Sequence, residues 1–289
     1  MSEPESVPDR PEEIGGYRID RVFGSRRYER GLSSWHPTFG QWAALKVLPP
    51  QALAGNPAVR ARFEQEGETT ARLAHPNVVA IYARGETQDG QLWIAMQYVE
   101  GTTAEAAVQD GAMTPPARAL GVISEVAEVL DYAHRCGGVV HQDVKPSNIL
   151  LGERSDGRER IVLADFGAAV ILSTTAEREP GGALVASFFA YTAPEVITGE
   201  TAIDGRADVY SLACTFFRLV TGSVPFPGHS TAAAMANAHV EQAAPPPISE
   251  LAPWAPPAAL DEVVSKRWPN VPRIATPQPV SSRRRLRER

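Results

Sequence analysis

Cysteine and long apolar runs are scarce in this chain of 289 residues. Its two cysteines, Cys136 and Cys214, cannot form a disulfide framework, and they favour a protein of a reducing compartment. No apolar run approaches the roughly 18 residues that a membrane-spanning helix needs. Residues 1–16 are acidic, proline-rich and without an apolar signal core, so we expect a disordered arm there. These absences predict a cytoplasmic protein with no membrane span in this chain.

Positive charge is also limited, and lysine above all. A net charge of -6 at pH 7 gives no reason to expect nucleic acid or an anionic membrane as a partner. Among the 28 basic residues only three are lysines, Lys46, Lys145 and Lys266, as GC-rich coding would produce. A lysine that remains in such a chain indicates a position that needs a compact ammonium rather than a forked guanidinium.

The pattern of apolar residues changes near residue 100. Residues 17–100 hold several short strand-like apolar runs and one helical pattern over 57–74, whereas residues 101–268 are mainly helical in pattern. Residues 269–289 are rich in proline and arginine, which forbids a long helix. We therefore expect an α+β protein with a small β-rich lobe, a large and mostly α lobe, and an irregular basic tail.

A dense group of polar residues occupies the segment HQDVKPSN at 141–148, and a further carboxylate, Asp165, ends the apolar run IVLAD. Two carboxylates and a carboxamide at this spacing suit a hard cation such as Mg²⁺, which takes one or two carboxylates and otherwise binds phosphate oxygens. The ammonium suits contact with a single phosphate oxygen. Each residue alone would be an ordinary loop residue. Together they indicate a phosphate-handling site.

Lys46 lies inside the apolar strand WAALKVL, and a buried ammonium needs an anion beside it. Glu66 can supply that anion, because it shares a helix face with Phe63 and Leu73. The alternative is that Glu66 is a solvated helix residue. Its apolar neighbours on the same face favour the buried position.

The order of three motifs identifies a family. The chain carries HxDxKxxN at 141–148, DFG at 165–167 and APE at 193–195, with Lys46 and Glu66 upstream. This set resembles the eukaryotic-like Ser/Thr protein kinases of bacteria, in particular those of actinobacteria, over about residues 17–266. The resemblance implies the bilobal kinase fold, with the N-lobe at 17–100 and an incomplete C-lobe at 101–268.

The resemblance also implies roles for the polar residues, with ATP and Mg²⁺ as cofactors. Lys46 would hold the α- and β-phosphates and pair with Glu66. Asp143 would accept the proton of the substrate hydroxyl, and Lys145 would steady the γ-phosphate. The magnesium ligands implied in this way are Asn148 and Asp165.

The residues around the adenine follow from the same resemblance. Ala44 would cover one face of the ring and Leu150 the other. Met96 would close the back of the pocket, and the backbone from Gln97 to Val99 would form the hinge between the lobes.

The chain departs from the family pattern at the phosphate loop and in the catalytic region. Gly24 is the one glycine of the Gly-rich loop that remains, because Arg26 and Glu29 replace the second and third. Glycine there lets backbone N–H groups approach phosphates, so we expect weak ATP binding. Gln142 replaces an arginine that grips a phosphorylated activation loop, and Phe188 replaces a threonine that bonds the catalytic residues.

The C-terminal tail, after Lys266, differs most from the family pattern. Written in GC-rich codons, one base inserted after the Lys266 codon turns KRWPNVPRIAT into KALAKRPEDRY, which resembles the usual end of the family. We hypothesise a one-base deletion after Lys266, a reading that the coding DNA tests directly. The lost arginine would be the partner of Glu195, and breaking a buried ion pair costs about 3–5 kcal/mol. Arg273 is a possible substitute.

Three functions remain open from the residues. The first is a Ser/Thr protein kinase with reduced activity, acting on protein hydroxyls. The second is a pseudokinase that serves as a binding or scaffold module. The third is a small-molecule phosphotransferase, which the APE and DVYSL segments disfavour. The oligomeric state does not follow from the sequence.

Overall fold

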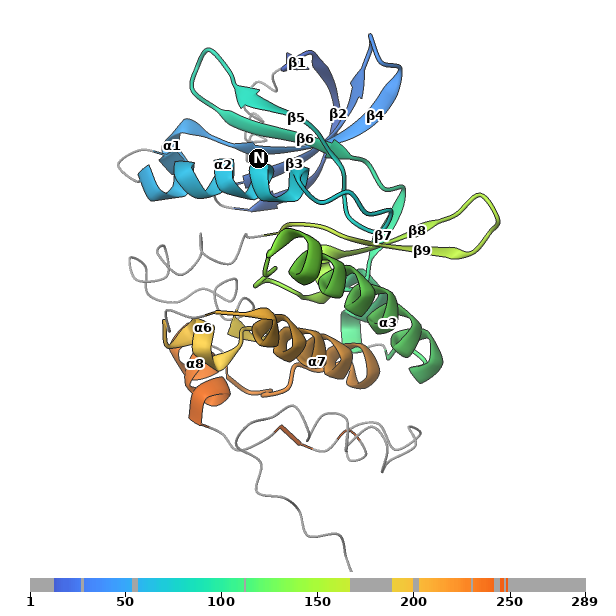
Figure 1. The fold of residues 1–289 in the computed structure, drawn as a ribbon, viewed down its shortest axis with the longest axis vertical. Helices are drawn as coiled ribbons and strands as arrows, with labels where there is room; N and C mark the ends of the chain where they lie inside the picture. The colour runs from blue at the N-terminus through green and yellow to red at the C-terminus, as the bar shows by residue number, and fades with distance from the viewer. Residues whose placement is uncertain are drawn as a thin grey trace, which may run out of the picture.

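The computed structural model has two lobes, one mainly β and one mainly α (Figure 1). It describes residues 13–26, 29–53, 57–111, 113–166, 189–199, 203–229, 231–241, 245–246 and 248. Within these ranges no helix is long and apolar enough to cross a bilayer. The expected α+β, bilobal fold is confirmed. The arm predicted for residues 1–16 lies mostly outside the described residues, and the tail at 269–289 lies wholly outside them.

The small lobe is built on one six-stranded sheet in which every neighbouring pair is antiparallel, in the order β1-β2-β3-β4-β6-β5. The strands are β1 (Glu13–Ile14), β2 (Tyr17–Arg26), β3 (Glu29–His36), β4 (Gln41–Leu48), β5 (Ile81–Glu86) and β6 (Leu92–Gln97). Side chains alternate between faces along a strand. On β4, Ala43, Leu45 and Val47 are buried on one face, which leaves Ala44 and Lys46 on the other.

The helix α2 (Pro57–Ala71) packs against one face of this sheet, and the short α1 (Pro50–Leu53) precedes it (Figure 1). Phe63 of α2 is buried in a cluster with Leu92 and Ile94 of β6. Gly67 permits the close approach, since a Cβ there would lie 3.2 Å from Ile94 Cδ1. The predicted helix over 57–74 therefore exists, but it ends at Ala71, before the turn that leads into β5.

The large lobe begins with a three-stranded antiparallel sheet in the order β7-β8-β9 and continues as packed helices. Its strands are β7 (Gly101–Thr103), β8 (Ile149–Glu153) and β9 (Glu159–Leu163). Its helical segments are η1 (Ala106–Gly111), α3 (Pro116–Tyr132), η2 (Ala133–Gly137), η3 (Pro146–Asn148), α6 (Pro194–Ile197), α7 (Gly205–Thr221) and α8 (Ala232–Glu241).

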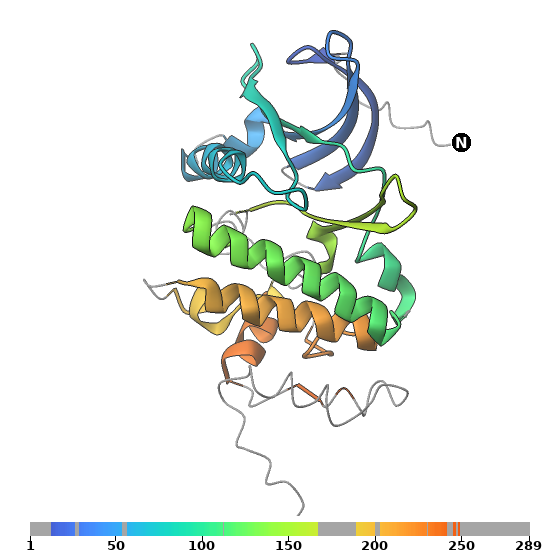
Figure 2. The ribbon, with the colours of Figure 1, turned by 45° about the vertical axis from the view of Figure 1, so that its right-hand side comes forward.

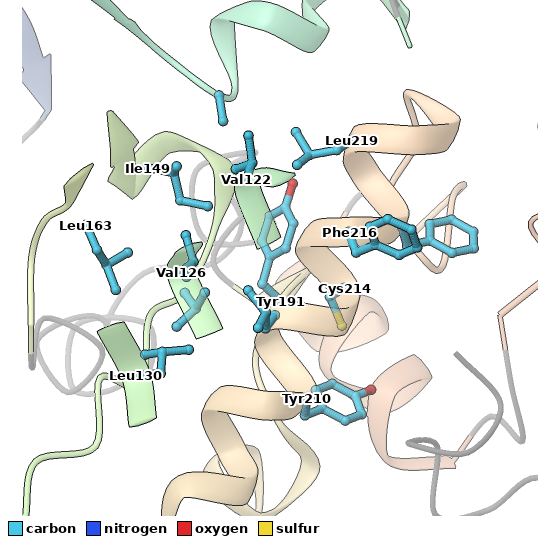
Figure 3. Packing of buried hydrophobic residues seen from close by; sticks show 14 of the residues in the cluster. Val122, Val126, Leu130, Ile149, Leu163, Tyr191, Tyr210, Cys214, Phe216 and Leu219 are labelled. Atoms are coloured by element: carbon cyan, nitrogen blue, oxygen red, sulfur yellow. The ribbon is translucent and has the colours of Figure 1, made fainter. Parts of the chain in front are cut away.

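Helices α3 and α7 run side by side through the large lobe, as both ribbon views show (Figures 1 and 2). In Figure 3, Val122 and Val126 of α3 lie opposite Phe216 and Leu219 of α7, and Tyr191 lies between the two helices. All five residues belong to the main buried cluster. This core makes α7 a rigid support for the loops that carry the polar residues.

Two further contacts place those loops. Thr215 of α7 is fully buried, and its hydroxyl donates a hydrogen bond of 3.1 Å to the carbonyl oxygen of Val144. Gly101 opens β7 with φ of 145°, a conformation essentially restricted to glycine. A Cβ at Gly101 would overlap the carbonyl oxygen of Leu151 on β8, so β7 reaches β8 only with glycine at this position.

We predict that Gly101→Ala destabilises the protein. Strain of this kind costs about 1–3 kcal/mol, which corresponds to a fall in melting temperature of about 5 °C. The matched control is Gly121→Ala on α3, where a Cβ would meet nothing within 4 Å. That control should raise the melting temperature slightly, because alanine is a better helix former by about 1 kcal/mol. Equal effects of the two substitutions in thermal unfolding would contradict the strain argument.

We also predict that Thr215→Val lowers the free energy of unfolding by about 1–3 kcal/mol, since the nearly isosteric side chain leaves the buried Val144 carbonyl without its donor. Thr215→Ser keeps the hydroxyl and loses one methyl, so it should cost only about 1 kcal/mol. Urea unfolding of both variants measures the difference. A serine variant that is less stable than the valine variant would assign the effect to packing instead.

Candidate active site

Lys46 is held between two carboxylates from different lobes. Its side chain leaves β4 on the face opposite the Leu45 core, and Lys46 is only 7% exposed. Lys46 Nζ lies 2.6 Å from Glu66 Oε1 on α2 and 3.3 Å from Asp165 Oδ1, just after β9. Burial lowers the pKa of Lys46, but the charges of Asp165 and Glu66 outweigh it and raise that pKa. The lysine is therefore an ammonium at neutral pH.

Glu66 has a second oxygen available. Oε2 is buried and, among the described residues, has no hydrogen-bond partner. Burial raises the pKa of Glu66 to about 7, against the lowering effect of the Lys46 ammonium. Glu66 thus points inward and pairs with Lys46, as predicted. The shared face with Leu73 was wrong, because α2 ends at Ala71 and Leu73 packs in the main buried cluster, apart from Phe63.

The loop after His141 gathers the other three polar groups. Lys145 Nζ lies 2.5 Å from Asp143 Oδ2. Asn148 Nδ2 donates to the main-chain oxygen of Asp143 at 2.8 Å and to its Oδ2 at 3.0 Å. All three side chains are buried. Lys145 and Asn148 both contact Oδ2 of Asp143, so they hold its carboxylate in one orientation through that oxygen.

This loop is anchored to α7 through Asp208, which is fully buried. Asp208 Oδ2 accepts from the backbone N–H of His141 at 2.8 Å, and Oδ1 accepts from the N–H of Gln142 at 2.7 Å. Gln142 has φ of 64°, in the left-handed region that is unfavourable for most residues. The carboxylate of Asp208 therefore stabilises the bend that presents Asp143.

Asp165 also has a left-handed backbone, with φ of 64°, and its side chain is 24% exposed. The neighbouring Phe166 is fully buried and lies against the ring of His141, with 4.4 Å between ring centroids. His141 Nε2 is 3.0 Å from the carbonyl oxygen of Ala164. These contacts hold Asp165 at the end of β9 with its carboxylate turned towards Lys46.

An apolar layer adjoins these polar groups, where the adenine residues were expected. Val79, Val162 and Ala164 are buried together, and the side chains that pack against them are Met96, Val99 and Leu150. Ala44 lies opposite Met96 across β4 and β6. The Gln97 N–H donates to the carbonyl oxygen of Ala80 at 2.8 Å. Met96, Val99 and Leu150 therefore lie in one apolar layer, and Ala44 and Gln97 lie beside Met96.

The remaining glycine of the phosphate loop lies near Lys46. Gly24 on β2 pairs with Gly31 on β3, which in turn pairs with Lys46 on β4. The backbones of Arg26 and Glu29, the two replacements of glycine, pair at the end of the β2–β3 ladder. Positions 27 and 28 lie outside the described residues, as do Phe188 and Arg273.

Few of the described side chains could act as ligands of a metal ion. Within the described ranges no group of three or more His, Cys, Asp or Glu side chains could hold a cation. Asn148 and Asp165 offer a carboxamide and a carboxylate, which fit Mg²⁺ that arrives with phosphate oxygens rather than a cage built of protein alone. Among the described residues, no lysine, arginine or histidine side chain forms an ion pair with Glu195.

A larger cavity than the one beside the polar site lies elsewhere. A hollow of about 330 Å³ lies between α2, β5 and β6, lined in part by Phe63, Arg84 and Trp93. A small cavity of about 10 Å³ adjoins the polar site, where Glu66, Thr70, Met96 and Asp165 meet. The contacts of the charged residues, and not the size of a cavity, therefore define the site.

Sequence reasoning missed three residues of this region. Val79 lies in the apolar layer, Thr215 bonds the Val144 carbonyl, and His134 bonds Asp208. Val79 lies within a short apolar run, residues 78–81, which offered a signal. Thr215 and His134 offered none, because each contacts a residue about seventy positions away in the chain.

Comparisons with known proteins all identify the same family. The Protein kinase domain family matches residues 21–265. The serine/threonine-protein kinase PknJ of Mycobacterium tuberculosis is 44% identical over 253 residues, which are 87% of this chain and 41% of that protein. PknI of the same organism is 38% identical over 261 residues, or 90% of this chain and 39% of that protein. The chain thus spans about two fifths of these two relatives.

A solved structure agrees. The crystal structure of the Mycobacterium tuberculosis PknI kinase domain matches with a TM-score of 0.67 and 34% identity, over 90% of each chain. The lobes, the ion pair of Lys46 with Glu66 and the loop braced by Asp208 had already indicated the same fold. The chain belongs to the protein kinase family, among the bacterial serine/threonine kinases of the eukaryotic-like type.

Proposed function

We propose that this chain transfers the γ-phosphoryl group of ATP to serine or threonine hydroxyls of a protein substrate. The observation that carries the proposal is the convergence at Lys46, whose ammonium lies 2.6 Å from Glu66 and 3.3 Å from Asp165. These groups come from three separate segments and meet beside an apolar layer. The scarcity of cysteine supports a reducing, cytoplasmic setting.

The nucleotide would lie between the lobes. Its adenine would contact the apolar layer formed by Val79, Val162 and Leu150, under Ala44, with Met96 behind it. Lys46 would hold the α- and β-phosphates, and Glu66 would keep the ammonium in place. Gly24 would lie over the phosphates, which follows from its position two strands from Lys46.

The chemistry would be positioning and charge neutralisation. Asp143 would accept the proton of the substrate hydroxyl at its carboxylate, and Lys145, 2.5 Å from that carboxylate, would neutralise charge on the phosphoryl group. Asn148 orients Asp143 through two hydrogen bonds. A held nucleophile and a held base account for much of the rate in such transfers.

Asn148 and Asp165 would hold Mg²⁺ together with the phosphates. When bound, the ion neutralises charge on the β- and γ-phosphate oxygens. The left-handed backbone of Asp165 would aim its carboxylate, which also pairs with Lys46 at 3.3 Å. The raised pKa of Lys46 keeps the ammonium charged beside it.

A pseudokinase remains a second candidate, and one observation favours it. The β2–β3 pairing ends with Arg26 opposite Glu29, where two glycines are expected, so fewer backbone N–H groups can approach the phosphates. Such a chain would bind a nucleotide weakly, or a protein partner, without transferring phosphate.

We predict that the purified chain transfers radiolabelled phosphate from ATP to a generic basic protein in the presence of Mg²⁺. Asp143→Asn should lower the rate at least about 100-fold, since a general base contributes about 10²–10⁴. Asp165→Ala should remove the Mg²⁺-dependent part of the thermal shift caused by ATP. A thermal shift in the wild type without any transfer would support the pseudokinase and refute the kinase.

We further predict opposite effects of the two loop residues on ATP binding. Glu29→Gly removes a like charge worth about 1 kcal/mol near the phosphates, so the KM for ATP should fall about fivefold. Arg26→Gly removes a cation and should raise the KM. Steady-state kinetics over a series of ATP concentrations measures both variants. Shifts in the same direction would show that charge at this loop does not control binding.

A further inference from the structure

His134 has a contact that the proposed function does not use. It lies in η2, just after α3, and its Nε2 is 2.7 Å from Asp208 Oδ2 on α7. The side chain of His134 is 22% exposed, whereas that of Asp208 is fully buried. Within the described ranges, His134 is the only side chain that forms an ion pair with Asp208. The imidazole therefore lies between solvent and the carboxylate.

The two carboxylate oxygens of Asp208 accept hydrogen bonds from three donors. Among the described residues, Oδ1 accepts from the N–H of Gln142, and Oδ2 accepts both from the N–H of His141 and from the His134 ring. A fully buried carboxylate is costly unless it is paired. Two backbone N–H groups carry no net charge, so His134 is the group that can neutralise it.

The start of α7 is shaped around this ring. A Cβ at Gly205 would lie 2.6 Å from His134 Nδ1, which is too close for any side chain. Gly205 has no positive φ, so its backbone does not require glycine. Glycine inside a helix costs about 1 kcal/mol against alanine. The space for the imidazole is therefore a reason, independent of the hydrogen bond, to assign His134 a role.

The charges around His134 favour its protonated form. The hydrogen bond to Asp208 raises the pKa of His134, burial lowers it less, and the carboxylates of Asp131 on α3 and Asp204 before α7 raise it further. Both of those carboxylates are also paired, Asp131 with Arg135 at 3.7 Å and Asp204 with Arg206 at 2.9 Å. Asp208 is thus the dominant partner.

We propose that His134 is a positioning residue for phosphoryl transfer: as an imidazolium it holds the Asp208 carboxylate against the backbone of His141 and Gln142, and so orients Asp143. The effect on rate rests on the proposed function. The effect on the loop does not, because it follows from the contacts of Asp208 alone.

The proposal gives a definite pH dependence. A histidine whose pKa is raised on folding adds stability that is fully present below its unfolded value, about 6.5, and is lost as the pH rises through the folded value. A neutral ring can still donate from Nε2, so the loss is partial. Stability and kcat should both decline above neutral pH.

The test compares the wild type with His134→Gln, which can donate a hydrogen bond but carries no charge at any pH. Thermal unfolding should show the wild type more stable by about 3 °C at pH 6, with the difference shrinking towards pH 8.5. Amide hydrogen exchange at residues 141–143 should be faster in the variant at pH 6. His36→Gln, on the small lobe, is the control and should leave amide exchange at residues 141–143 unchanged.

The kinetic part separates positioning from binding. At pH 6.5 His134→Gln should lower kcat about tenfold, as a misplaced catalytic group does, with little change in the KM for ATP. The kcat of the wild type should fall as the pH rises above neutrality. The kcat of the variant should not fall in this way. Parallel pH profiles of unfolding and equal amide exchange would overturn the proposal. If the wild type transfers no phosphate, the proposed function fails, and unfolding with amide exchange still decides the role of His134.

Discussion

The buried ammonium of Lys46 is the interaction on which the site depends. It is shut away from water and shared by a carboxylate of the small lobe, on α2, and one that follows β9 in the large lobe. Removing one partner of such a buried pair costs about 3–5 kcal/mol, against a typical total stability of about 5–15 kcal/mol. The position of α2, the end of β9 and the sheet are therefore set together by one charge.

The large lobe also contains a buried charge with fixed partners, but that charge is negative. There the buried charge is the carboxylate of Asp208, and its partners are backbone N–H groups of the loop and the ring of His134. Because α7 is packed tightly against α3, the loop inherits the rigidity of the core. Phosphoryl transfer demands little covalent participation from the protein and much accurate placement, so two fully partnered buried charges suit this chemistry.

The sequence was sufficient for the residues whose chemistry is unusual. Lys46 stood out because lysine is rare, Glu66 because of its apolar neighbours, and Asp143 because of the motif around it. The two-lobed fold followed from the change in apolar pattern near residue 100. His134 and Thr215 could not be found, because their partners lie 74 and 71 positions away and no local pattern encodes such contacts. The end of α2 was misjudged because apolar spacing continued into a turn.

Gly67 has a structural role that its low helix propensity does not show. In the sequence it is only a weak point in a helix, but in the fold its missing side chain sets how near α2 lies to Ile94. Glu66 is the residue beside Gly67, so the short distance that Gly67 allows between α2 and β6 also sets where the Glu66 carboxylate lies relative to Lys46. A bulkier side chain at position 67 would push α2 away from β6 and would carry that carboxylate away from the ammonium with it.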